Sequence, residues 1–438
     1  MRGKMTALPP PAAAAPAAGT DHTAGLSDRS LAAILLRLPS PATLARAGSV
    51  SRRWRRVASS PAFLRLFRRI HPPPLLGFFL CNGGFTVERV NGVLVGEVLS
   101  PTFFISNPAP PGLSGAVSRC VNFSLESLPN IEHWALADTR DGLLLLCDSF
   151  SAHDRLRVPR RFVVSDPVTG RSVLVRDAPI YEVDGESAYL GAALLLTDGD
   201  GGGGRLSFEV IVVTYFMWGP RLLVFSSLSG AWTVHPYANV GGSSRIMPML
   251  GSVGYDMHAN GCVYWLIDDE QETNDYLLVL DTGTKVFTTI KLLSGMRTRH
   301  EGNMRVVRTD SGELRLVALA GMVLDSWRLD RSRSSRGRWV REAGRELAYA
   351  DGAMALFAEI GGCRTVIMDA GDGFVFFKHF GSPWVFVLDL DAMVLTPLPH
   401  REKYYFGPAL PYRMALHPPF PVLDSSSSNI NLDELEQC

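Results

Sequence analysis

The stretch LSDRSLAAILLRLPSPATLARAGSVSRRWRRVASSPAFLRLF, Leu26–Phe67, decides the fold of the amino-terminal part of the chain. Its first helix is predicted from apolar residues at i, i+3, i+4 and i+7, which share one helix face: Leu31, Ile34, Leu35 and Leu38. Ser27 is the expected N-cap, and Asp28 in the first turn suits the positive end of the helix dipole. Pro39 is expected to end this helix.

Two further short helices are predicted in the same stretch. Ser40 and Pro41 are the expected N-cap and first residue of the second helix, which should end near Gly48. The third helix is predicted from apolar residues at i, i+4 and i+7 with arginines between them: Val50, Trp54 and Val57, and Arg52, Arg53, Arg55 and Arg56. Ser60 and Pro61 are expected to begin a turn. Because so short a unit cannot enclose a core of its own, its apolar stripe needs a partner.

The order of these residues resembles the F-box. The matching positions are Leu26, Asp28, Leu31, Ile34-Leu35, Leu38-Pro39, Leu44, Val50-Ser51, Trp54-Arg55 and Ser60-Pro61-Ala62-Phe63. Two positions depart from the family pattern, since Ser27 stands where a proline is usual and Ala33 where an acidic residue is often found.

The resemblance implies an adaptor-binding module. In the F-box family the motif docks onto a Skp-type adaptor, which in turn binds a cullin scaffold. By this resemblance the adaptor-contacting residues are Leu26, Leu31, Ile34, Leu35, Leu38, Leu44, Val50 and Trp54. It implies the substrate-recognition subunit of an SCF-type (Skp–cullin–F-box) ubiquitin ligase, a non-catalytic role, with a target protein that the sequence does not identify.

Charge and composition divide the chain into segments. Residues 1–74 hold a net charge of +10 and the rest a net of −10, which indicates a basic module joined to an acidic one. We expect a disordered Ala/Pro-rich lead at 1–24, the F-box helical domain at 25–70 and a Pro-rich spacer at 71–75. A substrate-recognition domain is expected at 76–422 and a disordered tail at 423–438.

After the spacer, the pattern changes from helical periodicity to many short strands. Five repeated units of strand, tight turn and return strand are predicted: Asp141–Leu146 with Phe162–Val173, Phe208–Phe216 with Leu223–Trp232, Gly261–Leu266 with Leu278–Phe287, Leu314–Leu319 with Ser326–Leu329 and Arg338–Val340, and Asp372–Phe377 with Val385–Asp391 and Val394–Leu395. Their turns carry Asp or Ser, which bond nearby backbone N–H groups, and Gly, which supplies a positive φ.

Repeated antiparallel units expose strand edges unless they close into a ring, which favours a β-propeller. Six blades are predicted, with Leu75–Leu80 and Phe85–Val95 supplying the sixth. The arrangement resembles the kelch-like, F-box-associated propellers of plant proteins. The predicted fold class is therefore α + all-β, a short three-helix F-box followed by a β-propeller.

No constellation of catalytic or metal-binding residues is found. The Gly run at 201–204 lacks the ending of a P-loop, and the six cysteines show no CxxC pair. Four histidines are separate from one another in sequence and are expected at the surface or in turns rather than as general bases: His133, His153, His235 and His258. We expect no cofactor, no metal and no enzymatic activity.

Two other functions stay open at this stage. The arginines around Trp54 also fit nucleic-acid phosphates with a stacking aromatic, although Trp54 shares a face with Val50 and Val57, which favours the adaptor. A propeller that only scaffolds other proteins is the second alternative. We expect no membrane partner and place the protein in the nucleus and/or cytoplasm.

Overall fold

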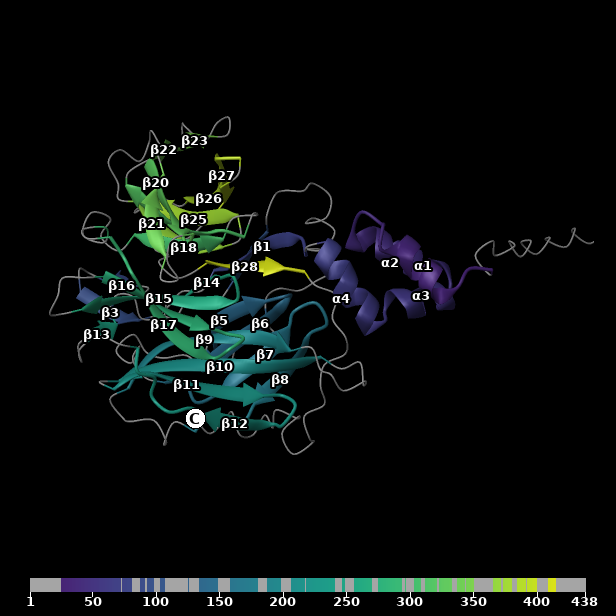
Figure 1. Ribbon diagram of the computed structural model, residues 1–438, viewed down its shortest axis with the longest axis horizontal. Helices are drawn as coiled ribbons and strands as arrows, with labels where there is room; N and C mark the ends of the chain where they lie inside the picture. The colour runs from purple at the N-terminus through teal and green to yellow at the C-terminus, as the bar shows by residue number, and fades with distance from the viewer. Residues whose placement is uncertain are drawn as a thin grey trace, which may run out of the picture. The chain divides into compact units, whose positions relative to one another are not determined.

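The computed structural model describes residues 25–71, 73–80, 87–90, 93–97, 103–106, 125, 134–148, 158–179, 187–197, 206–216, 218–240, 246–248, 256–269, 275–293, 296, 303–308, 312–320, 323–332, 337–342, 344–349, 365–371, 373–379, 384–390, 392–399 and 409–414. The chain divides into two compact units between Pro72 and Pro73 (Figure 1). The predicted disordered segments, 1–24 and 423–438, lie outside the described residues.

The first unit is helical, and each of its helices begins at a serine N-cap. The helices are α1 (Asp28–Leu35), α2 (Pro41–Val50), α3 (Arg52–Ala58) and α4 (Pro61–Ile70). The caps predicted at Ser27 and Ser40 are confirmed, because their hydroxyls accept from Ser30 N at 3.1 Å and Thr43 N at 3.3 Å. Thr43 Oγ1 in turn accepts from the Ser40 backbone N–H, which completes a capping box.

The predicted end of the second helix near Gly48 is wrong. Helix α2 continues to Val50, and the break comes at Ser51, whose extended backbone (φ −150°) caps α3. Gly48 instead lies against α3, where an added Cβ would come within 4.0 Å of the Ala58 Cβ. Val50 therefore closes α2 and does not open the third helix.

Within residues 25–71 the unit has four helices, not the predicted three. The segment after Ser60 is the ten-residue helix α4, with Ser60 as N-cap and Pro61 in the first turn. Its apolar residues recur at helical spacing, and one set is buried: Phe63, Leu64 and Phe67. The segment is helical because a helix places these three apolar side chains on one face, where they pack into the core of the unit. A turn would not align them on one face.

The second unit contains five antiparallel sheets of four or five strands, of which one carries an added parallel edge strand. The first is β5-β6-β7-β8 (Trp134–Arg140, Leu143–Asp148, Phe162–Asp166, Arg171–Val175), and the second is β12-β11-β10-β9 (Ala231–Val234, Gly219–Ser226, Ser207–Phe216, Ala188–Thr197). The third is β13-β15-β16-β17 (Ile246–Pro248, Cys262–Asp269, Asp275–Asp281, Val286–Lys291) with β14 (Met257–Ala259) on β15. The fourth is β18-β19-β20-β21 (Met304–Arg308, Leu314–Ala320, Val323–Asp330, Arg338–Arg341) with β22 (Arg345–Glu346) on β20. The fifth is β23-β27-β26-β25-β24 (Ala348–Tyr349, Val394–Pro399, Trp384–Asp389, Phe374–His379, Thr365–Gly371).

A smaller sheet joins the two ends of this unit. It has the order β28-β1-β4 (Ala409–Arg413, Leu75–Leu80, Phe103–Ser106), so the last described strand pairs with the first (Figure 1). The hairpin β2-β3 (Val87–Val90, Val93–Glu97) forms a separate two-stranded sheet. The described residues thus form five blades of four or five strands, one fewer than the six predicted, and a three-stranded closing sheet.

Hydrophobic clusters lie between successive sheets and hold the ring together. One cluster joins Phe208 of the second sheet to Phe162 of the first, and the others follow around the ring in the same way. The closing sheet packs on both sides, with Phe79 among residues of the first sheet and Phe78 among residues of the fifth. A β-propeller fold is therefore confirmed.

The predicted turn chemistry is also present. Asp281 Oδ1 accepts from Gly283 N at 3.0 Å and from Thr284 N at 2.8 Å, and Asp166 accepts from its own turn in the same way. Gly170 and Gly230 close two of these turns with positive φ of 67° and 64°. The turns therefore form from local side-chain bonds repeated from blade to blade.

Candidate functional site

The predicted adaptor-contacting residues divide into three groups in the structure. Three are buried and stabilise the helices: Leu31, Leu35 and Leu44. Three are half-buried: Leu26, Leu38 and Trp54. Two are exposed: Ile34 at 46% and Val50 at 69%. Of the predicted residues, only these two expose about half or more of an apolar side chain to a partner.

Helix α4 adds two exposed apolar residues that the sequence analysis missed. Leu66 is 45% exposed and Ile70 is 52% exposed. They were missed because this segment was predicted to be a turn. The available signal was the Ser60-Pro61 start followed by Phe63 and Phe67 at i, i+4.

The arginines of α3 are partly engaged within the helical unit. Arg53 Nε lies 2.8 Å from Asp28 Oδ1, and Arg56 Nη2 lies 3.2 Å from Asp28 Oδ2. The hydrogen bond from Arg53 is the main cause that holds the pKa of Asp28 below its usual value. Arg53 also donates to the Leu26 carbonyl. These contacts tie α3 to the start of α1. Arg52, Arg55 and Arg56 are all exposed, but of these three only Arg56 forms an ion pair with a described residue.

A second candidate site is a cavity in the middle of the β-rich unit. The strands β5, β9, β14, β18, β24 and β28 contact one another across sheets, so they are the innermost strands of the ring. Where several of them end, they surround a cavity of about 160 Å³. Its charged and titratable lining residues are Asp138, Arg140, Asp141, Asp256, His258, Arg308, Asp369 and Arg413.

His258 lies on strand β14 at the centre of a partly buried polar chain, not at the surface or in a turn as was predicted. Its Nε2 lies 2.9 Å from Asp256 Oδ2, and its Nδ1 lies 2.9 Å from Arg140 Nη2. Because a guanidinium can only donate, Nδ1 accepts and the ring proton is on Nε2, facing Asp256. Burial lowers the pKa of His258, but the Asp138 and Asp256 carboxylates outweigh it and raise the pKa overall. A proton on Nδ1 would break the Arg140 contact.

The cavity carboxylates are held by fixed donors. Asp138 accepts from Thr139 N at 2.7 Å and from Leu194 N at 2.8 Å, which joins β5 to β9. Asp369 accepts from Ala370 N at 2.7 Å. Burial, opposed chiefly by Arg305, raises the pKa of Asp369 to about 7.

Comparison with known protein families identifies both units. Residues 28–71 match the model described as F-box-like. Residues 136–420, more than half of the chain, match the model described as the β-propeller of F-box protein AT5G49610-like. The chain belongs to the AT5G49610-like F-box proteins. The predicted F-box and propeller are thereby confirmed for this F-box protein, while the kelch-like assignment stays a prediction.

Other comparisons add little to the family match. A search of curated proteins finds no match to this F-box protein. Among solved structures, a nidogen/laminin complex chain is 10% identical with a TM-score of 0.37, covering 78% of this chain and 100% of that one. Regucalcin from Agrobacterium tumefaciens is 12% identical with a TM-score of 0.33, covering 64% and 78%. A Lactobacillus plantarum protein is 12% identical with a TM-score of 0.30, covering 61% and 70%. Similarities this low do not bear on function.

Within the described residues of this F-box protein, no group of three or more His, Cys, Asp or Glu side chains is arranged to hold a metal ion. No described helix is both long and apolar enough to cross a membrane.

Proposed function

We propose that this F-box protein is the substrate-recognition subunit of an SCF-type ubiquitin ligase, with the helical unit bound to a Skp-type adaptor and through it to a cullin. The observation that supports this proposal is the exposure of Ile34 and Val50 within the F-box match. Covering the exposed part of each of these side chains would gain on the order of 1–2 kcal/mol, since full burial of such a side chain is worth about 1.5–3 kcal/mol. The helical unit therefore offers a surface that a second protein would complete.

In this role the chain carries out no bond chemistry. Its contribution is to hold a target protein close to the ubiquitin-carrying enzyme, which raises the effective concentration of the target lysine. The β-propeller supplies the target-binding surface, because it is the larger unit and presents many loops on a rigid scaffold.

The test is capture of a Skp-type adaptor by the full chain. Leu35 is buried, so a charge there would unfold the helices and would not report on the interface. Ile34→Asp and Val50→Asp are better variants, since both positions are exposed. We expect adaptor affinity to fall about tenfold or more with an unchanged melting temperature.

Val168→Asp is the matched control, because Val168 is 42% exposed but lies in the β-rich unit. It should bind the adaptor as the unaltered chain does. The proposal fails if the unaltered chain captures no Skp-type adaptor, or if the three variants bind equally well. Salt-sensitive binding to DNA or RNA that is lost when Arg52 and Arg55 become Gln would instead support a nucleic-acid role.

A further inference from the structure

The cavity inside the β-rich unit has no role in the proposed adaptor contact. It opens beside the turns that follow the innermost strands, where Asp141-Gly142 and Asn260-Gly261 line it. These turns need left-handed backbone at both positions, with φ of 49° and 83° in the first and 53° and 71° in the second. These two turns thus fix the backbone along part of the lining, and the cavity volume of about 160 Å³ is enough for one polar side chain of a partner.

Two arginines of this lining have no carboxylate partner among the described residues. Arg140 contacts only the uncharged Nδ1 of His258, and its Nε is buried without an acceptor. Arg308, at the end of β18, is exposed at the cavity and forms no ion pair with any described side chain. Because guanidinium groups stay charged at all physiological pH values, both are available to a negatively charged ligand.

Three of the carboxylates around the same cavity have hydrogen-bond donors within the protein. Asp138 accepts from two backbone N–H groups, Asp256 accepts from His258, and Asp369 accepts from Ala370 N. Asp138 and Asp256 thus have fixed donors in the protein, and Asp369, whose pKa burial raises to about 7, is mostly uncharged below that pH, whereas the charge of Arg140 and Arg308 has no carboxylate partner among the described residues. The unmet demand in the cavity is for an anion.

We propose that this cavity binds an acidic side chain, a glutamate or aspartate of the protein that this chain recruits, with Arg308 as its direct partner. This inference rests on the proposed function, since it assigns the kind of target that the propeller accepts. A carboxylate fits better than a phosphate, because Asp141 and Asp256 line the same cavity and repel a doubly charged group more strongly than a singly charged one. A planar carboxylate also matches the two parallel N–H donors of a guanidinium.

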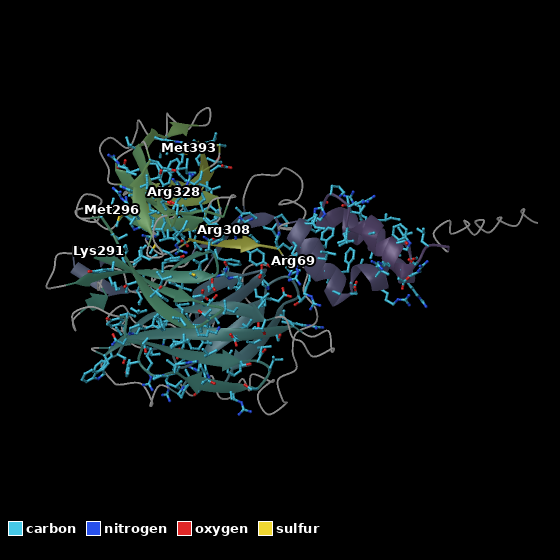
Figure 2. All side chains as sticks on the ribbon, in the orientation of Figure 1. Arg69, Lys291, Met296, Arg308, Arg328 and Met393 are labelled. Carbon is cyan, nitrogen blue, oxygen red and sulfur yellow. The ribbon has the colours of Figure 1, made fainter. Side chains whose placement is uncertain are left out.

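The experiment is a selection of random heptapeptides displayed on phage, using the full chain as bait. We expect peptides rich in Glu and Asp to be enriched. Arg308→Gln should abolish that enrichment. The matched control is Arg328→Gln, because Arg328 lies on β20 of the same sheet but does not line the cavity (both arginines are labelled in Figure 2).

The affinity of the selected peptide is then measured by fluorescence anisotropy. Two variants of the peptide are measured beside it: one with each acidic residue replaced by its amide, and one with each acidic residue replaced by phosphoserine. We expect the amide peptide, and the Arg308→Gln protein, to bind about tenfold more weakly. Arg308→Lys should bind the acidic peptide more tightly than Arg308→Gln does and more weakly than the unaltered chain, since it keeps the charge but loses the paired donors. A phosphoserine peptide that binds more tightly than the acidic one would overturn the choice of carboxylate.

Other outcomes overturn the inference altogether. These are the enrichment of neutral or basic peptides, an acidic enrichment that survives Arg308→Gln, an equal loss in Arg328→Gln, or no enrichment. Adaptor capture is measured on the same protein samples. Capture without acidic-peptide binding would refute this inference alone, and acidic-peptide binding without capture would refute the proposed ligase role alone.

Discussion

The two units differ in where they leave apolar side chains. The helical unit exposes four large ones within residues 25–71: Ile34, Val50, Leu66 and Ile70. The much longer β-rich unit exposes eight in its described residues, and several sit in or beside hairpin turns, as Val168 and Leu228 do. The helical unit therefore exposes more large apolar side chains for its length, which favours a unit that meets a partner. The helical unit is thus arranged for a partner and the β-rich unit for closing on itself.

The largest effect is expected where the ring closes. Tyr412 of β28 is fully buried, stacks edge-on against Phe79 at 5.5 Å, and donates its hydroxyl to the Gly142 carbonyl at 3.1 Å. Tyr412→Ala should lower the free energy of unfolding of the β-rich unit by about 3–5 kcal/mol, because it leaves a cavity between the closing sheet and the first sheet. Urea unfolding followed by tryptophan fluorescence measures this.

Tyr412→Phe is the control for that prediction, because it keeps the ring and removes only the hydroxyl. It should lose about 1 kcal/mol. If Tyr412→Ala lost no more than Tyr412→Phe does, β28 would not be what closes the ring, and the contrast between the two units would weaken.

The second prediction uses pH. The pKa of Asp369 is raised to about 7 by burial, so between about pH 4 and pH 7 the folded state holds a proton that the unfolded state has released. Stability must therefore fall as pH rises through this window. Asp369→Asn stays uncharged, so its stability relative to the unaltered chain should rise from pH 4 to pH 8, by at most about 4 kcal/mol.

Other groups beside Asp369 also titrate or carry charge. Arg305, His258 and Asp256 all act on its pKa, so only the difference between the two proteins is informative. Thermal unfolding at matched pH values gives that difference. An unchanged difference from pH 4 to pH 8 would mean that Asp369 does not hold a proton in the folded state.

The third prediction concerns a single turn of the second sheet. Gly219 has a φ of 113°, and an added Cβ would lie 2.5 Å from the Ala238 carbonyl oxygen. Gly219→Ala should therefore cost about 2 kcal/mol or more, from backbone strain and this clash. The measurement is again urea unfolding.

Gly283→Ala is the matched turn glycine for this comparison. Its φ is not in the left-handed region, and the nearest atom to an added Cβ would be Asp281 Oδ1 at 3.4 Å, so it should lose no more than about 0.5 kcal/mol. Equal losses at the two glycines would show that the turn at Gly219 relaxes freely.

The sequence predicted the middle strands of the blades and missed the innermost ones for a physical reason. Strands such as β6 are buried on both faces and read as aliphatic runs. Strand β5 alternates buried and half-buried residues and ends in Thr139-Arg140, while β14 is only three residues long and carries His258. Their polar side chains face the cavity, so the pattern that marks a strand is interrupted where the candidate site forms.

In the helical unit the caps and helix starts could be predicted because serine and proline act locally. Which residues of the apolar stripe are buried and which are exposed could not be predicted. Ile34 and Leu35 are adjacent on the helix and chemically alike, yet one is 46% exposed and the other is fully buried. Which of them faces a partner depends on where α3 and α4 pack, and α4 itself was predicted as a turn.

The smallest effect is expected at the clamp between α1 and α3. Asp28 is an exposed carboxylate that pairs with Arg53 and Arg56, and these pairs lower its pKa. The stability it contributes is therefore present above the usual Asp pKa and is lost as pH falls through the lowered one. Asp28→Asn should slightly lower the melting temperature of the helical unit near pH 7 in dilute salt, and the difference should vanish in about 1 M salt.

Asp177→Asn is the control, because Asp177 is an exposed carboxylate of the β-rich unit with no ion pair among the described residues. It should leave the melting temperature unchanged at either salt concentration. Because Asp28→Asn does not change the exposed apolar side chains of the helical unit, it should also keep its adaptor affinity, unlike Ile34→Asp. Loss of adaptor binding in Asp28→Asn would instead place the Asp28–Arg53 pair inside the interface, and the adaptor surface would then be polar as well as apolar.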